Sequence, residues 1–446
     1  MDGMKGWPEE AKEYIKRLEQ KIDALTRELE SVTAAFAEYK KRHPPNTGVK
    51  NGKPYHFKSP ARSKTSKKPG AKKGHTPHVR PPPEEIDEVR SVPVDVCPVC
   101  GGSELSDVQE TRERTYEDIP LPRPVAIKLL IERRYCRHCH RLVEALVPEV
   151  LPGARLSLQV MLIVTYCKIR YRMTVEAIPN VLETLFGLHI STGEVIHILD
   201  QVAHAFGPYY DQLVERVRGA PARYIDETSW RINGETAYLW GFVSQGMALY
   251  RIASSRSHKV PLHVLGTEYT GVDVHDRFSA YKTLARKTNT PQQDCWAHII
   301  TNAEELAHFY GDEGDHICQV VKQIYLDAKA YGHHGTDDDI ESLYQHMADR
   351  LTRPYTSHHC HRFVMNLLKE KDNLFEFVKN PQVDGTNNAA ERALRPPVVA
   401  RKISGGNRSV KGAKTYEVLL SVVQTLHQNG KNLVEHGPGI LLASDG

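Results

Sequence analysis

The sequence predicts a multidomain α/β protein in which several smaller modules precede an α/β core. Three observations predict this class. Apolar residues recur at heptad spacing near the N-terminus, two Cys-x-x-Cys pairs follow a basic stretch, and strand-like and helix-like segments alternate from residue 222 onward. With 446 residues and a 40% apolar composition, the chain has room for two to four domains and at least one substantial core.

The sequence carries no pattern typical of a membrane or secreted protein. No uninterrupted apolar run approaches the ~20 residues that span a bilayer. The first residues, MDGMKGWPEE, lack the charged-then-apolar pattern of a secretory signal. We therefore expect a cytoplasmic protein with no membrane partner.

Residues 8–42 predict a coiled coil. Their apolar positions alternate spacings of three and four, and Glu, Lys and Arg fill the positions between. The heptad positions are Ile15, Leu18, Ile22, Leu25, Leu29, Val32 and Phe36. Self-association, as a dimer or a higher oligomer, is the expected consequence; a helix that packs on its own globular domain is the alternative.

A basic segment follows the heptads. From Lys40 to Arg80 there are thirteen Lys and Arg residues and no Asp or Glu, although the net charge of the whole chain is only +4. Interleaved Pro, Gly and Ser prevent a packed core, so we expect a flexible linker whose charge binds phosphates. A solvated tail is the alternative. The expected nucleic-acid contacts are Lys67, Lys68, Lys72 and Lys73.

Two cysteine pairs predict a zinc ribbon. The sequences are CPVCGG at 97–102 and CRHCH at 136–140, and between them RERTYEDIP and VAIKLLIERRY alternate like paired strands. Four thiolates would surround one Zn²⁺ and leave no position for an activated water, so the metal would be structural. His138 and His140 are possible substitutes for a cysteine ligand. The predicted ligands are Cys97, Cys100, Cys136 and Cys139.

Residues 155–218 read as helices. An apolar helix runs to about Phe186, Gly187 and Leu188 form a turn, and Ser191 caps a second helix. This pattern resembles a helix-turn-helix that reads DNA, but a plain helical hairpin has the same pattern.

From residue 222 the pattern predicts three antiparallel strands, a helix, a strand, a helix and another strand. Asp226 lies in the first strand, within ARYIDETSW, and Asp276 ends the fourth, within GVDVHDRFSAY. This is the element order of a ribonuclease-H-like core, in which the first and fourth strands are neighbours. Asp226 and Asp276 should therefore meet at one edge of the sheet.

The segment DGTNNAAERALRP, residues 384–396, predicts a helix that ends at Pro396 and carries Glu391 and Arg395 on one face. A surface ion pair is one interpretation. The other is that Glu391 completes a three-carboxylate site with Asp226 and Asp276. Oxygen ligands favour Mg²⁺ or Mn²⁺, and a pair of such ions ~3.5–4 Å apart supports phosphoryl transfer.

Several other residues are weaker candidates. Asp273 is the main rival for the second acidic ligand, although strand alternation would point it to the opposite face, and Asp294 is a further candidate. His298 is either an orienting or proton-shuttling group or a satisfied histidine at a helix start. Asn387 is expected to cap a helix. We read HHCH at 358–361 and DDD at 337–339 as solvated surface rather than metal sites.

The chain resembles the DDE transposases of the insertion sequence 66 family. The resemblance covers nearly the whole chain, through the N-terminal coiled coil, KKPGAKKGH, the two cysteine pairs, YIDETSW, DRFSAY, CWAH and NNAAERALRP followed by RK. It implies that the catalytic triad is Asp226, Asp276 and Glu391. The implied activity is Mg²⁺-dependent cutting of the ends of a mobile element and joining of its 3′ ends to target DNA, without a covalent protein–DNA intermediate.

The partners expected from this resemblance are double-stranded DNA of the element's terminal inverted repeats and of the target, in a prokaryotic nucleoid. Small accessory proteins of the same element are a further partner that the sequence leaves open. Cations close to the metals would contact the DNA backbone. These are Arg392, Arg395, Arg401 and Lys402. The alternatives are a ribonuclease-H-like nuclease without strand transfer and a catalytically idle, transposase-derived DNA-binding protein.

The expected domain boundaries follow from these segments. They are a coiled coil at 1–43, a basic linker at 44–90, a zinc ribbon at 91–150, a helical region at 151–218, the first part of the core at 219–301, a helical insertion at 302–380, and the Glu391 helix with a C-terminal helix at 381–446.

Overall fold

The computed structural model describes residues 81, 83–120, 122–145 and 147–443 of the chain. The predicted coiled coil and the four lysines of the basic segment lie outside these residues. Two compact units are distinguished, Met1–Asp118 and Ile119–Gly446. In the described part of the first unit, the chain turns at Cys97, whose carbonyl accepts a hydrogen bond from Gly101 at 2.8 Å. No described helix is long and apolar enough to cross a membrane.

The second unit contains a small hairpin around its Cys-x-x-Cys pair. Strands β1 (Arg133–Cys136) and β2 (Arg141–Glu144) are antiparallel. The prediction of longer strands at RERTYEDIP and VAIKLLIERRY is wrong, because in these described segments only the hairpin residues form a strand. Ile127, Leu129 and Ile131 are exposed, so no apolar face is buried that would hold such a pairing together.

In the described part of the chain, four helices precede the main sheet. They are α2 (Leu158–Ile169), α3 (Ala177–Phe186), α4 (Thr192–Ala205) and α5 (Gly207–Arg218). Gly187 ends α3 with φ of 65°, a left-handed conformation that glycine adopts without strain. The Ser191 hydroxyl accepts the backbone N–H of Glu194 at 3.1 Å and so caps α4. The turn and the cap that the sequence predicted are confirmed.

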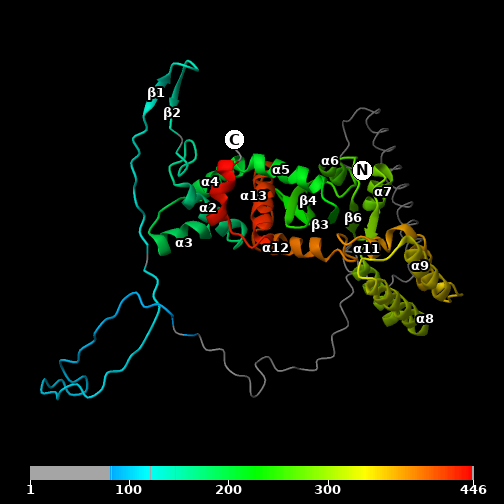
Figure 1. The fold of residues 1–446 in the computed structure, drawn as a ribbon, viewed down its shortest axis with the longest axis horizontal. Helices are drawn as coiled ribbons and strands as arrows, with labels where there is room; N and C mark the ends of the chain where they lie inside the picture. Colours follow the sequence, from blue (N-terminus) through cyan, green and yellow to red (C-terminus); the bar gives the residue numbers. More distant parts are fainter. Residues whose placement is uncertain (1–80, 82, 121, 146, 444–446) are drawn as a thin grey trace, which may run out of the picture. The chain divides into compact units, whose positions relative to one another are not determined.

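A five-stranded mixed sheet forms the centre of this unit, as Figure 1 shows. Its strands and connecting helices are β3 (Ala222–Ile232), β4 (Glu235–Ser244), β5 (Met247–Ala253), α6 (Lys259–Leu265), β6 (Val272–His275), α7 (Ser279–Thr288) and β7 (Gln292–Asp294). The strand order is β5-β4-β3-β6-β7. Strand β3 is antiparallel to β4 and parallel to β6, which confirms the predicted element order and the predicted neighbours.

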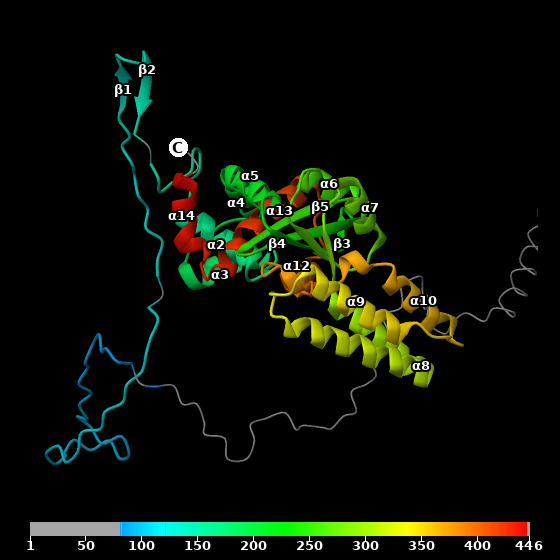
Figure 2. The ribbon, with the colours of Figure 1, turned by 45° about the vertical axis from the view of Figure 1, so that its right-hand side comes forward.

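A second group of helices lies between β7 and the Glu391 helix. They are α8 (Trp296–Ala330), α9 (Asp337–Leu351), α10 (His358–Leu368), the 3-10 turn η2 (Lys371–Asn373) and α11 (Glu376–Lys379). Figure 2 shows α8, α9 and α10 side by side. Their buried residues form a hydrophobic cluster with β6 that is separate from the cluster between β3–β5 and the other helices. The indole N–H of Trp296 donates to the Leu374 carbonyl at 2.6 Å and ties the start of α8 to the segment before α11.

Helix α12 (Asn388–Ser404) does not end at Pro396, so that prediction is wrong. It continues through Pro396 and Pro397 although proline cannot donate the usual backbone hydrogen bond. The carbonyl that Pro397 leaves without its intrahelical donor is that of Ala393. It accepts the Tyr250 hydroxyl at 2.7 Å instead, so the helix can continue without an unsatisfied buried carbonyl.

Helix α13 (Val410–Gln428) covers the edge strand β5, and α14 (Leu433–Ala443) follows it. Three alternate backbone N–H groups of β5 would otherwise lack partners. They donate to side chains spaced four residues apart on α13: Ala248 to Thr425 at 3.1 Å, Tyr250 to Ser421 at 2.9 Å, and Ile252 to Glu417 at 2.7 Å. The match is possible because four helical residues rise about 6 Å and two strand residues about 6.7 Å.

We expect the substitution Ser421→Ala to lower the free energy of unfolding by about 1–3 kcal/mol, because the buried N–H of Tyr250 would lose its acceptor. Urea denaturation followed by circular dichroism measures this change. The matched control is Ser342→Ala, on an exposed face of α9. Equal stability of the two variants would contradict the role of Ser421 at the sheet edge.

Candidate active site

The register between β3 and β6 brings the first two acids together. Tyr224 is the parallel partner of Val274, so continuing the same register by two residues places Asp226 level with Asp276. Asp226 is in the middle of the long strand β3, and Asp276 directly follows β6. One oxygen of Asp276 accepts the backbone N–H of Phe278 at 3.0 Å, which fixes the turn that leads into α7.

Helix α12 brings the third acid to the same place. The helix packs tightly on the sheet at Gly241, the β4 partner of Asp226, where an added Cβ would lie 3.3 Å from the Leu394 side chain. Asn387 precedes the helix, and its side-chain amide donates to the Ile225 carbonyl at 2.8 Å. Asn387 therefore does not cap the helix through its side chain, contrary to the prediction, but anchors the helix to β3 beside Asp226.

The three carboxylates interact electrostatically. The pKa of Asp226 is raised to about 7, first because the side chain is largely buried and then because Glu227, Asp276 and Glu391 add negative charge around it. The backbone N–H of Glu227 donates to Asp226 at 2.8 Å and offsets only part of this. The charges of Asp276 and Glu391 thus reach Asp226, and we call these three residues the acidic cluster; that they bind metal ions together stays a prediction.

Glu227 is a fourth acid at the cluster that the sequence analysis did not single out. Its carboxylate accepts the Tyr281 hydroxyl and pairs with Arg256 at 2.6 Å. The Arg256 guanidinium also lies over the Phe278 ring, 4.1 Å from the ring centre. Glu227 therefore has its own cation. Its place next to Asp226 in the sequence could have indicated that Glu227 belongs to the site. Nothing in the sequence around Arg256 indicates that Arg256 is its partner.

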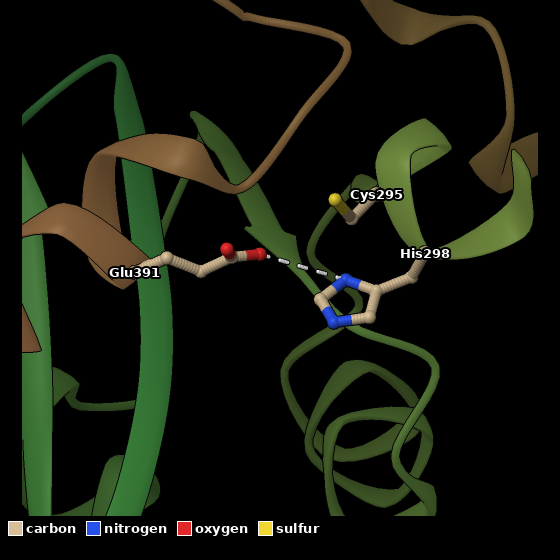
Figure 3. Close-up of side chains that lie close together, drawn as sticks. All are labelled: Cys295, His298 and Glu391. Carbon is tan, nitrogen blue, oxygen red and sulfur yellow. Dashed lines mark ion pairs between the residues drawn. The ribbon is translucent and has the colours of Figure 1, made fainter. Parts of the chain in front are cut away.

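His298 lies next to Glu391, as Figure 3 shows. Its Nδ1 is 3.7 Å from a Glu391 oxygen. A hydrogen bond with Cys295, and then the charges of Cys295, Glu391 and Asp276, raise the pKa of His298 to about 9 in spite of burial. His298 is thus an ion-pair partner of Glu391, the partner that the sequence had suggested Arg395 could be. The sequence analysis did not select Cys295 as a site residue, although the Cys-x-x-His spacing in CWAH could have indicated that it lies beside His298.

The two rival acids are held by other partners. Asp273 is fully buried and forms a two-pronged ion pair with Arg223, at 2.7 and 3.0 Å. The Arg223 guanidinium also stacks on Tyr269, 3.2 Å from the ring centre. Asp294 is buried at the end of β7, 3.5 Å from Arg277, and burial raises its pKa to about 6. The Asp273 carboxylate is therefore bound to Arg223 within the fold.

Three of the four predicted cations of α12 are exposed. These are Arg392, Arg395 and Lys402. The guanidinium of Arg401 is instead bound to β3, where it donates to the Ser229 backbone carbonyl and, at 2.5 Å, to the Ser229 hydroxyl. Arg401 is therefore already engaged within the fold.

The four predicted zinc ligands fall in both units. Cys97 and Cys100 belong to the first and Cys136 and Cys139 to the second, so the four-cysteine site stays a prediction. Within each pair the local arrangement is the same. In each pair, the backbone N–H groups of the residues three and two positions later donate to the first cysteine. These hydrogen bonds lower the pKa of the Cys97 and Cys136 thiols, which favours the thiolate form that binds metal.

The HHCH and DDD segments have structural roles. Asp339 forms a reciprocal capping box with Thr336 at the start of α9, and Asp337 pairs with Lys379. Cys360 is buried in the helical cluster. Among the described residues, the group of three that could hold a metal ion is instead Cys295, His298 and Glu391.

Comparison with known proteins identifies the family. The family model described as transposase IS66 family matches residues 153–415, which is more than half of the chain. The chain is also similar to three uncharacterized proteins of Sinorhizobium fredii. It is 24% identical to y4hP over 416 residues, covering 83% of this chain and 73% of that protein, and 23% identical to y4qI over 415 residues, covering 83% and 74%. With y4jD it shares 22% identity over 370 residues, covering 75% and 71%.

The matched region contains all three acids of the cluster, together with the sheet and the helices that position them. The chain belongs to the transposase IS66 family.

Proposed function

We propose that the chain is a DDE-type transposase that cuts the ends of an insertion sequence and joins their 3′ ends to target DNA. Asp226, Asp276 and Glu391 would hold two Mg²⁺ or Mn²⁺ ions in a ribonuclease-H-like core. Membership of a transposase family makes DNA the expected partner and transposition the expected process. Action on prokaryotic DNA would place the protein in the cytoplasm, at the nucleoid.

The observation that carries this proposal is the parallel β3–β6 register, which places Asp226 level with Asp276, where the charge of Glu391 also reaches it. Burial and three neighbouring carboxylates raise its pKa to about 7, and of these neighbours Glu227 is balanced by Arg256. Asp226, Asp276 and Glu391 supply only oxygen donors, which suit a hard divalent cation. A cation of charge +2 would offset the mutual repulsion of the three carboxylates, so the chemistry of these donors suits the ions.

Two bound ions would activate a water or a 3′-hydroxyl and stabilise the leaving oxygen at phosphorus. The surrounding residues would position the ligands. Asn387 anchors the start of α12 to Ile225, which fixes Glu391 relative to Asp226. Protonated His298 would hold the Glu391 carboxylate through their ion pair. Arg392, Arg395 and Lys402 would bind DNA phosphates near the cluster.

The segments before the core would serve DNA binding and assembly. The predicted coiled coil would join two chains so that two element ends are held together, and the lysine-rich linker would bind phosphates. The zinc ribbon would be stabilised by four cysteines. The α3–α4 pair has the turn and the cap of a helix-turn-helix and would contribute base contacts.

We expect Asp226→Asn, Asp276→Asn and Glu391→Gln each to lower DNA cleavage and 3′-end joining by at least about a thousandfold. Loss of a charged ligand would remove several kcal/mol of transition-state stabilisation by the metals. The measurement uses labelled DNA with candidate element ends, Mg²⁺ and the full chain.

The matched control is Asp338→Asn, an exposed acid in the first turn of α9, which should retain full activity. Joining that survives all three active-site changes would contradict the proposal. Cleavage without joining in the unchanged protein would favour a nuclease, and equal DNA binding with no chemistry would favour a binding protein.

The substitution Cys97→Ser should remove about one equivalent of bound Zn²⁺ and expose the region before residue 150 to proteolysis. The core should keep its melting temperature, because a structural zinc stabilises only the module that it closes. Zinc analysis and limited proteolysis measure these effects, with Cys318→Ala as the control. Unchanged zinc content in Cys97→Ser would rule out the ribbon.

A further inference from the structure

A second possible metal site adjoins the acidic cluster. One ligand atom each from Cys295, His298 and Glu391 lie within 4.8 Å of one another. Cys295 immediately precedes α8, His298 is in its first turn, and Glu391 reaches toward them from α12, as Figure 3 shows. The site is therefore assembled from two helices that are almost a hundred residues apart in the sequence.

The donor atoms of this group differ in kind from those of the three carboxylates. Sulfur, nitrogen and oxygen together suit Zn²⁺, which binds Cys, His and Glu in tetrahedral sites, whereas Mg²⁺ prefers oxygen alone. Three protein ligands are the number that a zinc site with one open position uses. The side chains of His298 and Glu391 are 45% and 35% exposed, so an ion can reach the group from solvent.

The cysteine is held in place by its surroundings. The backbone N–H of Asn387 donates to the Cys295 sulfur at 3.1 Å, and the N–H of Cys295 donates to the His275 carbonyl at 2.9 Å. Contacts of this kind orient a metal-binding sulfur from the outer shell. Cys295 is fully buried, and its sulfur lies within 4.8 Å of the ligand atoms of His298 and Glu391.

We propose that Cys295, His298 and Glu391 form a site for Zn²⁺ that shares Glu391 with the magnesium site. A carboxylate that binds zinc beside Cys295 is withdrawn from Asp226 and Asp276. Zinc occupancy and the assembly of the catalytic ions therefore exclude each other, and Zn²⁺ inhibits the enzyme. The inhibitory part rests on the proposed function, whereas zinc binding itself does not.

Zinc binding is tested with the full chain and a competing zinc indicator. The unchanged protein should bind one Zn²⁺ more than Cys295→Ala. The difference in bound Zn²⁺ between the two proteins is the measurement, because the predicted zinc ribbon would bind its own ion in both. His298→Ala and Glu391→Gln should each weaken the same site by at least about tenfold, as expected when a ligand is lost. The control is Cys318→Ala, a buried cysteine of the same helix outside the group.

Melting curves establish that each variant folds, and the more exposed His298 provides a second variant if Cys295→Ala does not. Equal zinc binding by the unchanged protein, Cys295→Ala and His298→Ala would overturn the site. Full affinity in Glu391→Gln would overturn the sharing of the carboxylate.

Inhibition is tested by adding Zn²⁺ to the DNA-joining reaction at fixed Mg²⁺. The zinc concentration that halves the rate should rise when Mg²⁺ is raised tenfold, by up to about tenfold once Mg²⁺ is saturating, as direct competition for one carboxylate requires. Zinc that binds but does not slow joining would overturn the inhibitory role. A chain that neither cuts nor joins DNA would refute the proposed function, and the difference in zinc binding would still decide the site.

Discussion

The parallel pairing of β3 with β6 is the constraint on which the candidate site depends. It places Asp226 level with Asp276, and nothing local in the sequence could do so across fifty residues. The cost is the burial of the Asp226 carboxylate and its repulsion by neighbouring carboxylates, which together raise the pKa of Asp226. At the same pairing, the buried Arg223 of β3 forms an ion pair with Asp273 of β6.

Helix α12 depends on that sheet for both its position and its continuity. Gly241 lets it approach β4 closely, Asn387 fastens its start to β3, and Tyr250 on β5 satisfies the carbonyl that Pro397 leaves free. Contacts of α12 and of the residue before it with three different strands therefore fix the position of Glu391. Helix α13 covers the β5 edge of the sheet, and its side chains accept hydrogen bonds from the outward N–H groups of β5.

Glu391 also stands between two environments of different chemistry. On one side are the hard carboxylates of Asp226 and Asp276, and on the other the softer donors Cys295 and His298. The proposed zinc site and the proposed magnesium site therefore share this one carboxylate. Asn387 keeps Cys295 and His298 close to Glu391, because it lies just before α12 and hydrogen-bonds to both Ile225 and Cys295.

The sequence by itself determined the element order, the Gly187 turn and the Ser191 cap, because strand and helix periodicity and local capping chemistry are properties of short segments. It also named the strands that would be neighbours. Only the tertiary structure decided where α12 ends, since its prolines are tolerated through Tyr250, a residue about 145 positions away. The tertiary structure also decided which groups Asp273, Arg401 and Glu391 contact. Charged side chains pair according to distance in space, and that distance is set by packing between segments far apart in the chain.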